Sequence, residues 1–332
     1  MAIIHKNILK KLPIISLLFS LILFIILFFV YKNFNTKELI DSLDGVSLKT
    51  IIIAVVIMWF NFLINTLRFK YIISVKLEGS VSFFTLFHLN LLGVFAAHLA
   101  PVGPAADLVR FGYARWKLKL PTKPLVEAII MDRFIALIGL AVTGICSLPI
   151  QWYLSVEPLL VYLQALLWGA CFSSAVIVYV LGRQSSADPN RKLFTALTSF
   201  GMVFRAVLRG WSNVFLQMVC AIGYSGSFCL LMWVFANDMG IQTGIWFFLT
   251  FSSLVLLSQS LPIFYAGWGA REFTAITVMG SVGTVSVSEA ASIGVCAGVA
   301  LFLASLPGAV LHFHGKKNKF ADHTETPTRD VV

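Results

Sequence analysis

Long stretches of this chain contain no Asp, Glu, Lys or Arg. A helix needs ~20 apolar residues to cross the hydrocarbon core of a bilayer, and each of these stretches reaches or approaches that length. Of the 332 residues, 58% are hydrophobic and only 12% are charged, whereas about a quarter of the residues in a soluble domain are charged. The sequence therefore predicts an all-α polytopic membrane protein. The uncharged stretches are 12–31, 50–67, 79–106, 134–156, 158–182, 210–237, 239–270 and 290–315.

Two of these stretches differ from ordinary spans because Pro and Gly interrupt them. Residues 79–106 lead into the sequence HLAPVGPAADLVR, and residues 239–270 lead into LPIFYAGWGAREF. Broken backbone at membrane depth is tolerated only where it is buried in protein or lines a wet cavity. We therefore expect two re-entrant helical hairpins, at 82–119 and about 244–281. Six full spans remain, at 12–31, 50–67, 128–148, 158–181, 212–236 and 290–312.

The distribution of basic residues favours this topology over eight simple spans, which would place strongly basic loops on both sides of the membrane. With two hairpins, only Lys32, Lys37 and Lys49 of the 25 Lys and Arg fall outside. Arg133 and Arg271 lie in or near the membrane, and all the others fall on the cytoplasmic side, as the positive-inside rule requires. Both termini are then cytoplasmic. The net charge of +10 is explained by orientation and by anionic lipid headgroups, so we expect no nucleic-acid partner.

This topology also predicts an inverted repeat, the commonest architecture of secondary transporters. Repeat one covers about 12–148 and repeat two about 158–312, and each reads span, span, hairpin, span, starting from opposite sides. In both hairpins a proline is followed nine residues later by an arginine, at Pro101 and Arg110 and at Pro262 and Arg271.

The membrane domain is expected to cover 1–315 and to be followed by a short polar cytoplasmic tail, 316–332. Between the repeats, residues 191–209 carry Leu193, Leu197, Phe200, Phe204 and Leu208 at helical spacing among basic residues. Such a pattern is typical of an amphipathic helix on the cytoplasmic leaflet. The alternative is a simple connecting helix.

Three short motifs, in order, carry a resemblance to a known family. They are APVGPAADLVR, MDRF at 131–134 and LPIFYAGWGAREF. Together they resemble the lysylphosphatidylglycerol synthase transmembrane region, a family of flippase-like integral membrane proteins, over nearly the whole chain. Ala105 and Ala106 stand where the family usually has more glycine. The resemblance implies movement of lipids, aminoacylated lipids or lipid-linked glycans across the bacterial cytoplasmic (inner) membrane. Only a short polar run follows Lys319, so we expect no aminoacyl-transferase domain and no enzyme activity.

An anionic headgroup needs countercharges to cross hydrocarbon, and guanidinium groups bind phosphate in bidentate fashion. Arg110 and Arg271 are therefore the predicted phosphate ligands, with Asp107 and Glu272 holding them when the site is empty. Helix N-termini beyond the two prolines would add free N–H groups. The predicted headgroup site further includes the glycines Gly103, Gly267 and Gly269, which allow close approach, and the aromatic residues Tyr265 and Trp268. Asp132 and Arg133 are interpreted as a structural charge pair.

Two other classes of function remain open. An integral membrane glycosyltransferase or other lipid-modifying enzyme would act on a polyprenyl-phosphate substrate, but its catalytic and metal-binding carboxylates would have to come from acids that here stand beside arginines. A scaffold of a lipid or glycan biosynthesis complex is the other alternative. No motif for a metal or cofactor is present in the sequence, so none is expected. The expected partners are a membrane phospholipid or a polyprenyl-phosphate-linked glycan, with a second copy of the chain or biosynthetic enzymes as further candidates.

Overall fold

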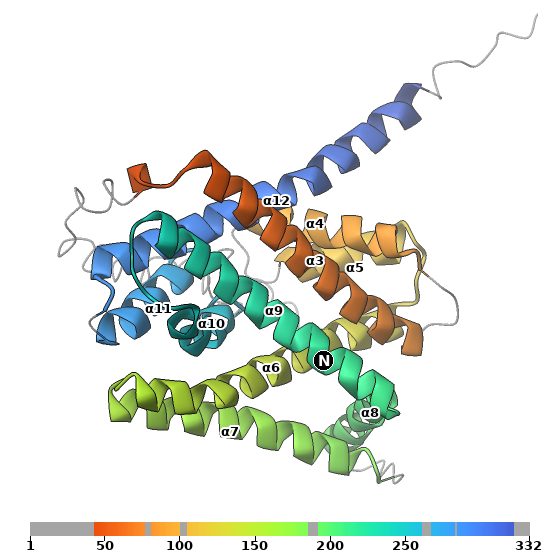
Figure 1. Ribbon diagram of the computed structural model, residues 1–332. Helices are drawn as coiled ribbons and strands as arrows, with labels where there is room; N and C mark the ends of the chain where they lie inside the picture. The colour runs from red at the N-terminus through yellow and green to blue at the C-terminus, as the bar shows by residue number, and fades with distance from the viewer. Residues whose placement is uncertain are drawn as a thin grey trace, which may run out of the picture.

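The computed structural model describes residues 43–76, 81–99, 105–184, 192–260, 267–282 and 284–321. The expected first span, 12–31, and the predicted site residues Gly103 and Tyr265 lie outside this part of the chain, as do Pro101 and Pro262. The described residues form ten α-helices, one 3-10 turn and no strand (Figure 1). The predicted all-α class is confirmed.

The helices follow one another along the chain with short connections, and four of them are long and apolar enough to cross a membrane. These four are α3, α7, α9 and the segment Val287–His312 of α12. The ten helices are α3 (Leu48–Lys76), α4 (Phe83–Leu99), α5 (Ala105–Trp116), α6 (Thr122–Tyr153), α7 (Pro158–Leu181), α8 (Lys192–Val207), α9 (Trp211–Asp238), α10 (Ile245–Ser260), α11 (Ala270–Met279) and α12 (Val287–Ala321).

Large apolar side chains on the outer faces of the long helices are exposed. On α3, Ile52, Val56 and Phe60 are each more than half exposed, and Leu166 on α7 is 74% exposed. A soluble protein rarely exposes apolar patches of this extent. Lipid is the solvent that such surfaces fit, which supports the membrane character of the chain.

Two interrupted helix pairs stand where the sequence predicted hairpins. Helices α4 and α5 pack against each other across the break at 100–104, and α10 and α11 pack against each other across the break at 261–266. Whether these pairs return to their side of entry in a membrane stays a prediction, as does the count of six full spans.

The helix contacts of the two halves correspond to each other. When α3, α4, α5 and α6 are replaced in order by α9, α10, α11 and α12, and the reverse, every contact between two of these eight helices corresponds to an observed contact. Helix α3 packs on its own counterpart α9, and the two run antiparallel, because Ser47 bonds Asp238 while Asn61 bonds Tyr224 and Ser227. The exchanged pairs are α4–α12 with α6–α10, α3–α6 with α9–α12, α3–α12 with α6–α9, α3–α4 with α9–α10, α5–α6 with α11–α12, and α4–α5 with α10–α11. An inverted repeat produces this pattern.

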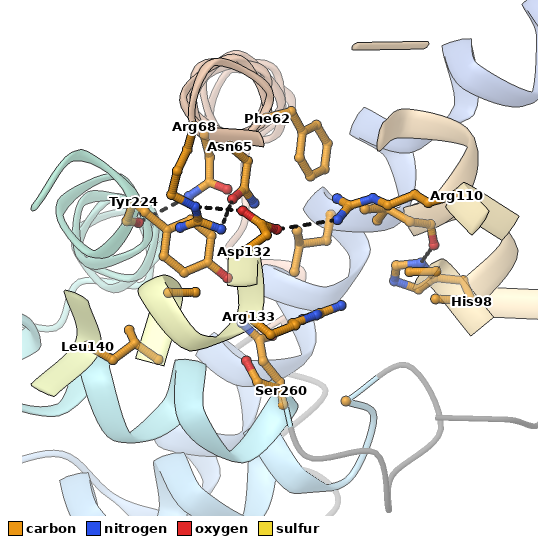
Figure 2. Close-up of a pocket in the computed structure, with 18 residues that line it drawn as sticks. Phe62, Asn65, Arg68, His98, Arg110, Asp132, Arg133, Leu140, Tyr224 and Ser260 are labelled. Atoms are coloured by element: carbon orange, nitrogen blue, oxygen red, sulfur yellow. Dashed lines mark hydrogen bonds and ion pairs between the residues drawn. The ribbon is translucent and has the colours of Figure 1, made fainter. Parts of the chain in front are cut away.

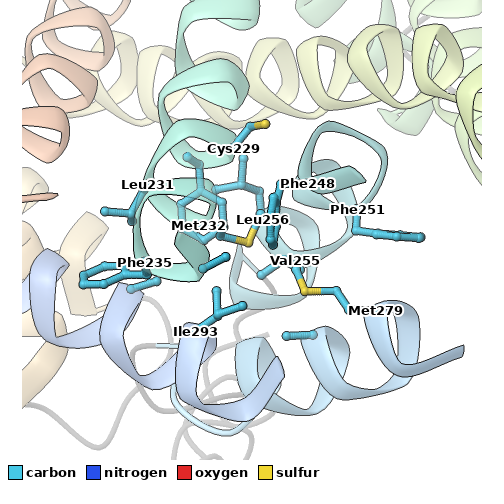
Figure 3. Packing of buried hydrophobic residues seen from close by; sticks show 14 of the residues in the cluster. Cys229, Leu231, Met232, Phe235, Phe248, Phe251, Val255, Leu256, Met279 and Ile293 are labelled. Carbon is cyan, nitrogen blue, oxygen red and sulfur yellow. The ribbon is translucent and has the colours of Figure 1, made fainter. Parts of the chain in front are cut away.

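The apolar core consists of two clusters. The larger one joins α9, α10, α11 and α12 and extends to α3, α4, α6 and α7; Figure 3 shows its part around Met232, Phe248 and Ile293. The smaller one joins the Lys76 end of α3 to α4, α5, α6, α7 and α8. Both clusters fix the helices that surround the polar centre described below.

Helix α8 stands within the predicted amphipathic segment, but much of its apolar face is buried in the protein. Phe204 is 3% exposed, and its ring and that of Phe200 each lie 5.3 Å from the ring of Phe134 on α6. Gly201 packs directly on the backbone of Gly182 at the end of α7. Leu197, in contrast, is 39% exposed. Contact of the helix with the lipid leaflet stays a prediction.

Helix α12 is longer than the expected span 290–312 and continues to Ala321. The expected polar tail at 316–332 therefore begins as helix. Lysine has a high intrinsic helix propensity, so the basic sequence after residue 315 does not by itself end a helix.

Candidate functional site

A polar cavity of about 170 Å³ lies where α3, α4, α5, α6, α9, α10 and α12 meet (Figure 2). Its walls carry Arg68, Arg110 and Arg133, one carboxylate, Asp132, and the polar side chains of Asn61, Asn65, His98, Tyr224, Gln259 and Ser260. A single ordered water needs only ~10–15 Å³ of such space. The cavity therefore has room for several waters or for a small charged group.

Asp132 is the centre of the charge network. Its Oδ1 lies 2.8 Å from Nε of Arg68, and its Oδ2 lies 3.7 Å from Nη1 of Arg110. The side chains of Asp132 and Arg68 are only 5% and 4% exposed. Burial makes an ionised group costly unless it is paired, and here one carboxylate compensates two guanidinium groups.

The Arg110 side chain contacts four other side chains. Besides Asp132, its Nη1 lies 3.7 Å from Oδ1 of Asp107 one turn away, and its Nη2 donates to Oδ1 of Asn90. Its guanidinium also lies over the ring of Phe69. The predicted contact between Asp107 and Arg110 is present, but it is the longer of the two contacts that Asp107 makes.

Arg133 takes the closer contact with Asp107. Nε and Nη2 of Arg133 donate to the two carboxylate oxygens of Asp107 at 2.9 and 3.0 Å, in fork geometry. The Arg133 side chain is 48% exposed. Of the three arginines around the cavity, Arg133 is thus the one that an incoming anion reaches most readily.

Asp132 and Arg133, which the sequence placed together as a structural pair, turn to different partners. Asp132 bonds Arg68 on α3, and Arg133 bonds Asp107 on α5. Neighbouring residues on a helix point about 100° apart, so they do not face each other. Both residues line the cavity and belong to one network. Around the cavity three guanidinium groups face two carboxylates, so the described residues leave one positive charge in excess.

Arg271 and Glu272 form a second charged cluster beside the cavity. Nη2 and Nε of Arg271 donate to Oε1 of Glu272 at 2.8 and 3.2 Å, and the guanidinium lies over the ring of Trp268 at 5.0 Å. The other oxygen of Glu272 accepts the N–H of Gly269 at 2.6 Å, which caps the start of α11. Gly298 on α12 leaves room for the Arg271 side chain.

This second cluster does not open into the cavity. Arg271 is fully buried, and neither it nor Glu272 is among the residues that line the cavity. Two neighbouring residues connect this cluster to the cavity: Gly267 lines it, and the ring of Trp268 contacts the lining residue His98 edge-on. Binding of a headgroup by Arg271 stays a prediction.

Sequence reasoning missed the residues that α3 contributes. Arg68 was counted only as a cytoplasmic charge, and Asn61 and Asn65 were not considered. The signal that finds them is helical spacing: Asn61, Asn65 and Arg68 stand at i, i+4 and i+7, which places three polar side chains on one face of an otherwise apolar helix.

A family model described as "Lysylphosphatidylglycerol synthase TM region" matches residues 14–308. That range includes every cavity-lining residue of the described structure. No curated protein and no solved structure matches the chain.

Proposed function

The chain belongs to the family of the lysylphosphatidylglycerol synthase transmembrane region, as the motifs predicted, and from this premise we propose that it moves an anionic lipid from one leaflet of the membrane to the other. The family is a membrane domain of lipid-related, flippase-like proteins. The polar cavity of Figure 2, with its excess positive charge, is the observation that carries the proposal.

The cavity has the chemistry that the polar part of such a lipid requires. A phosphodiester or phosphate group loses its hydration inside the membrane and must receive charged hydrogen bonds in return. Arg133 supplies an accessible guanidinium, and Arg110 supplies a second one behind it. Both can bind phosphate with two parallel N–H donors. The phosphate would compete with the Asp107 carboxylate for Nε and Nη2 of Arg133, so Asp107 would release Arg133 as the phosphate binds.

The acyl chains have no place in the cavity, which at about 170 Å³ has room only for a small group. We propose that they stay in the surrounding lipid, against the exposed apolar faces of the helices, while the headgroup alone enters. Under the topology expected from the basic residues, the cavity lies on the cytoplasmic side of the bacterial inner membrane, and the exchange pattern of the helices supports two alternating arrangements of the halves.

The proposal is tested with purified protein in vesicles of phosphatidylglycerol and phosphatidylcholine that carry fluorescent phosphatidylglycerol, a fluorescent neutral diacylglycerol or a fluorescent polyprenyl phosphate. Leaflet accessibility is followed by dithionite quenching. We expect protein-dependent exchange of at least one phosphate lipid, and a marked loss of that exchange in Arg133→Gln. Equal rates in parent, variant and empty vesicles would contradict transport and leave the enzyme and scaffold proposals.

Glu127→Gln serves as a matched control. Glu127 on α6 pairs with Lys76 on α3 at 2.6 Å, so this ion pair, like that of Arg133, joins α6 to a neighbouring helix. Neither Glu127 nor Lys76 lines the cavity. Loss of this ion pair should leave translocation unchanged. If Glu127→Gln reduces the rate as strongly as Arg133→Gln, the rate reports the packing of α6 against its neighbouring helices rather than headgroup recognition.

A further inference from the structure

Beyond the cavity, a line of polar side chains continues along the same face of α6. The cavity ends at Leu140, and Thr143, Ser147 and Gln151 follow at spacings of three and four residues, which keeps them on one side of the helix. All three are buried, with Gln151 at 0% exposed. From Asp132 to Gln151 the helix rises roughly 28 Å, at 1.5 Å per residue, which is close to the ~30 Å hydrocarbon thickness of a bilayer.

These side chains bond across the contact between α6 and α10. Oγ1 of Thr143 lies 2.9 Å from Oγ of Ser253 on α10 and 3.2 Å from Oγ of Ser225 on α9. Nε2 of Gln151 donates to the backbone oxygen of Thr250 at 3.2 Å. Hydroxyl and amide groups therefore occupy this helix contact over about two turns of α6.

The counterpart contact, between α4 and α12, is formed by different side chains. The exchange of the halves relates α6–α10 to α4–α12, and the residue shift that takes Arg110 to Arg271 takes Leu92 to Ser253. At the corresponding crossing Gly308 of α12 packs on Leu91 and Leu92 of α4, and one turn away Phe95 stacks on Phe302. The polar contact there is between Nε2 of His88 and the backbone oxygen of Gly308, at 3.0 Å. Apolar packing loses its hydrophobic stabilisation when it opens to water, whereas hydroxyl and amide groups exchange one set of hydrogen bonds for another.

The far end of the line is incompletely satisfied in the closed arrangement. Nε2 of Gln151 donates to Oε1 of Gln164 on α7 at 2.9 Å, but Oε1 of Gln151 and Nε2 of Gln164 have no hydrogen-bond partner among the described residues, and neither has Nε1 of the fully buried Trp168. Buried polar groups without partners are costly. An acceptor such as a phosphate oxygen, or water, would satisfy the two free N–H groups.

We propose that the contact between α6 and α10 parts during transport, and that Thr143, Ser147, Gln151, Gln164 and Ser253 then line the path by which the headgroup leaves the arginine cavity toward the opposite leaflet. This inference rests on the proposed function. These side chains would form a transit site for a phosphate-bearing headgroup, because neutral donors bind phosphate weakly enough to release it. The headgroup would bind first in the arginine cavity and then move along the neutral polar side chains.

A reversible cross-link tests the path. Thr143→Cys with Ser253→Cys places two thiols where the hydroxyl groups now touch, so that mild oxidation ties α6 to α10. The control pair is Ser47→Cys with Asp238→Cys, which joins the ends of α3 and α9, where Oγ of Ser47 lies 3.2 Å from Oδ1 of Asp238. The parent, with its five native cysteines, is oxidised alongside. We expect oxidation to abolish exchange of fluorescent phosphatidylglycerol in the first pair only, and dithiothreitol to restore it. Undiminished exchange in the oxidised, cross-linked first pair would overturn the proposal.

A second measurement does not depend on transport at all. Gln151→Cys is buried in this arrangement, so a small charged methanethiosulfonate reagent can modify it only if α6 and α10 part. Native Cys229, which is 2% exposed in the apolar core, is the internal control in the same sample. Modification of Gln151→Cys with Cys229 untouched is the expected result by mass spectrometry. If neither thiol reacts, the path is wrong even where translocation is seen, whereas modification without lipid exchange would keep the opening and refute the proposed cargo.

Discussion

Replacing Asp132 by Asn should lower stability and strengthen anion binding at the same time. The substitution removes a carboxylate that is 5% exposed and lies 2.8 Å from Arg68 and 3.7 Å from Arg110. Both guanidinium groups remain buried, and Arg68 has no other carboxylate in the described structure. Leaving such a charge uncompensated costs ~3–5 kcal/mol. The excess charge around the cavity also rises by one unit, and a unit charge ~6 Å from a bound anion contributes on the order of 3 kcal/mol at an effective dielectric constant of ~20.

Arg133→Gln is the matched comparison, because both changes break an ion pair around one cavity. The Arg133 side chain is 48% exposed, so loss of its pair with Asp107 should cost less than ~1 kcal/mol of stability. The excess positive charge disappears, and anion binding should weaken. The two variants are therefore expected to change stability by very different amounts and affinity in opposite directions.

The assay combines urea unfolding in detergent micelles, followed by tryptophan fluorescence, with calorimetric titration of short-chain phosphatidylglycerol. Asp132→Asn should lower the unfolding midpoint strongly and Arg133→Gln only slightly. The reasoning is refuted if the two variants unfold alike, because the cavity would then screen all three arginines equally. It is also refuted if Asp132→Asn binds the lipid more weakly than the parent, because the carboxylate would then be a ligand rather than a competing charge.

Three further outcomes follow from contacts outside the cavity. Gly201→Val should destabilise the docking of α8 by ~1–3 kcal/mol, because a Cβ there meets the backbone of Gly182, and limited trypsin digestion should then cut the α8 region faster than in the parent. Glu272→Gln should cost ~3–5 kcal/mol by leaving Arg271 buried without its carboxylate, and the double change with Arg271→Gln should recover part of that loss in a thermal melt. Gly298→Leu should lower the melting temperature, since its side chain would occupy the space of the Arg271 guanidinium, while Gly298→Ala should do so less.

Helix class and order were predictable from the sequence because they depend on uncharged length and on helix breakers. The runs that begin at 158 and 210 become α7 and α9 with little change in their bounds, and the run that begins at 50 becomes α3, which continues nine residues past Leu67 to Lys76. The two interruptions were visible as Pro and Gly at 101–104 and 262–269. These features are local, so a single sequence is sufficient to find them.

The partners of the charged residues were not predictable in the same way. Asp132 and Arg133 are adjacent in the sequence, but they bond residues on α3 and α5, and these contacts are set by how the helices pack. Arg271 and Arg110 share a sequence pattern, yet one is sealed against α12 and the other lines the cavity. Gly298 of α12 leaves the space in which the Arg271 side chain is enclosed, whereas Arg110 faces Asp132 of α6. Local spacing does not show which side chains of a neighbouring helix face a hairpin.

The antiparallel contact between α3 and α9 has a consequence for the origin of the chain. It is the contact in which a helix of one half packs on its own counterpart in the other half. In an isologous interface, likewise, both partners use the same surface. A half-length ancestor that inserted in both orientations and paired through one such surface, followed by duplication and fusion of its gene, leaves this arrangement behind. Fusion then frees the two copies to diverge, so the first half could gather arginines around a cavity, while the two crossings between the halves, α6–α10 and α4–α12, acquired different side chains.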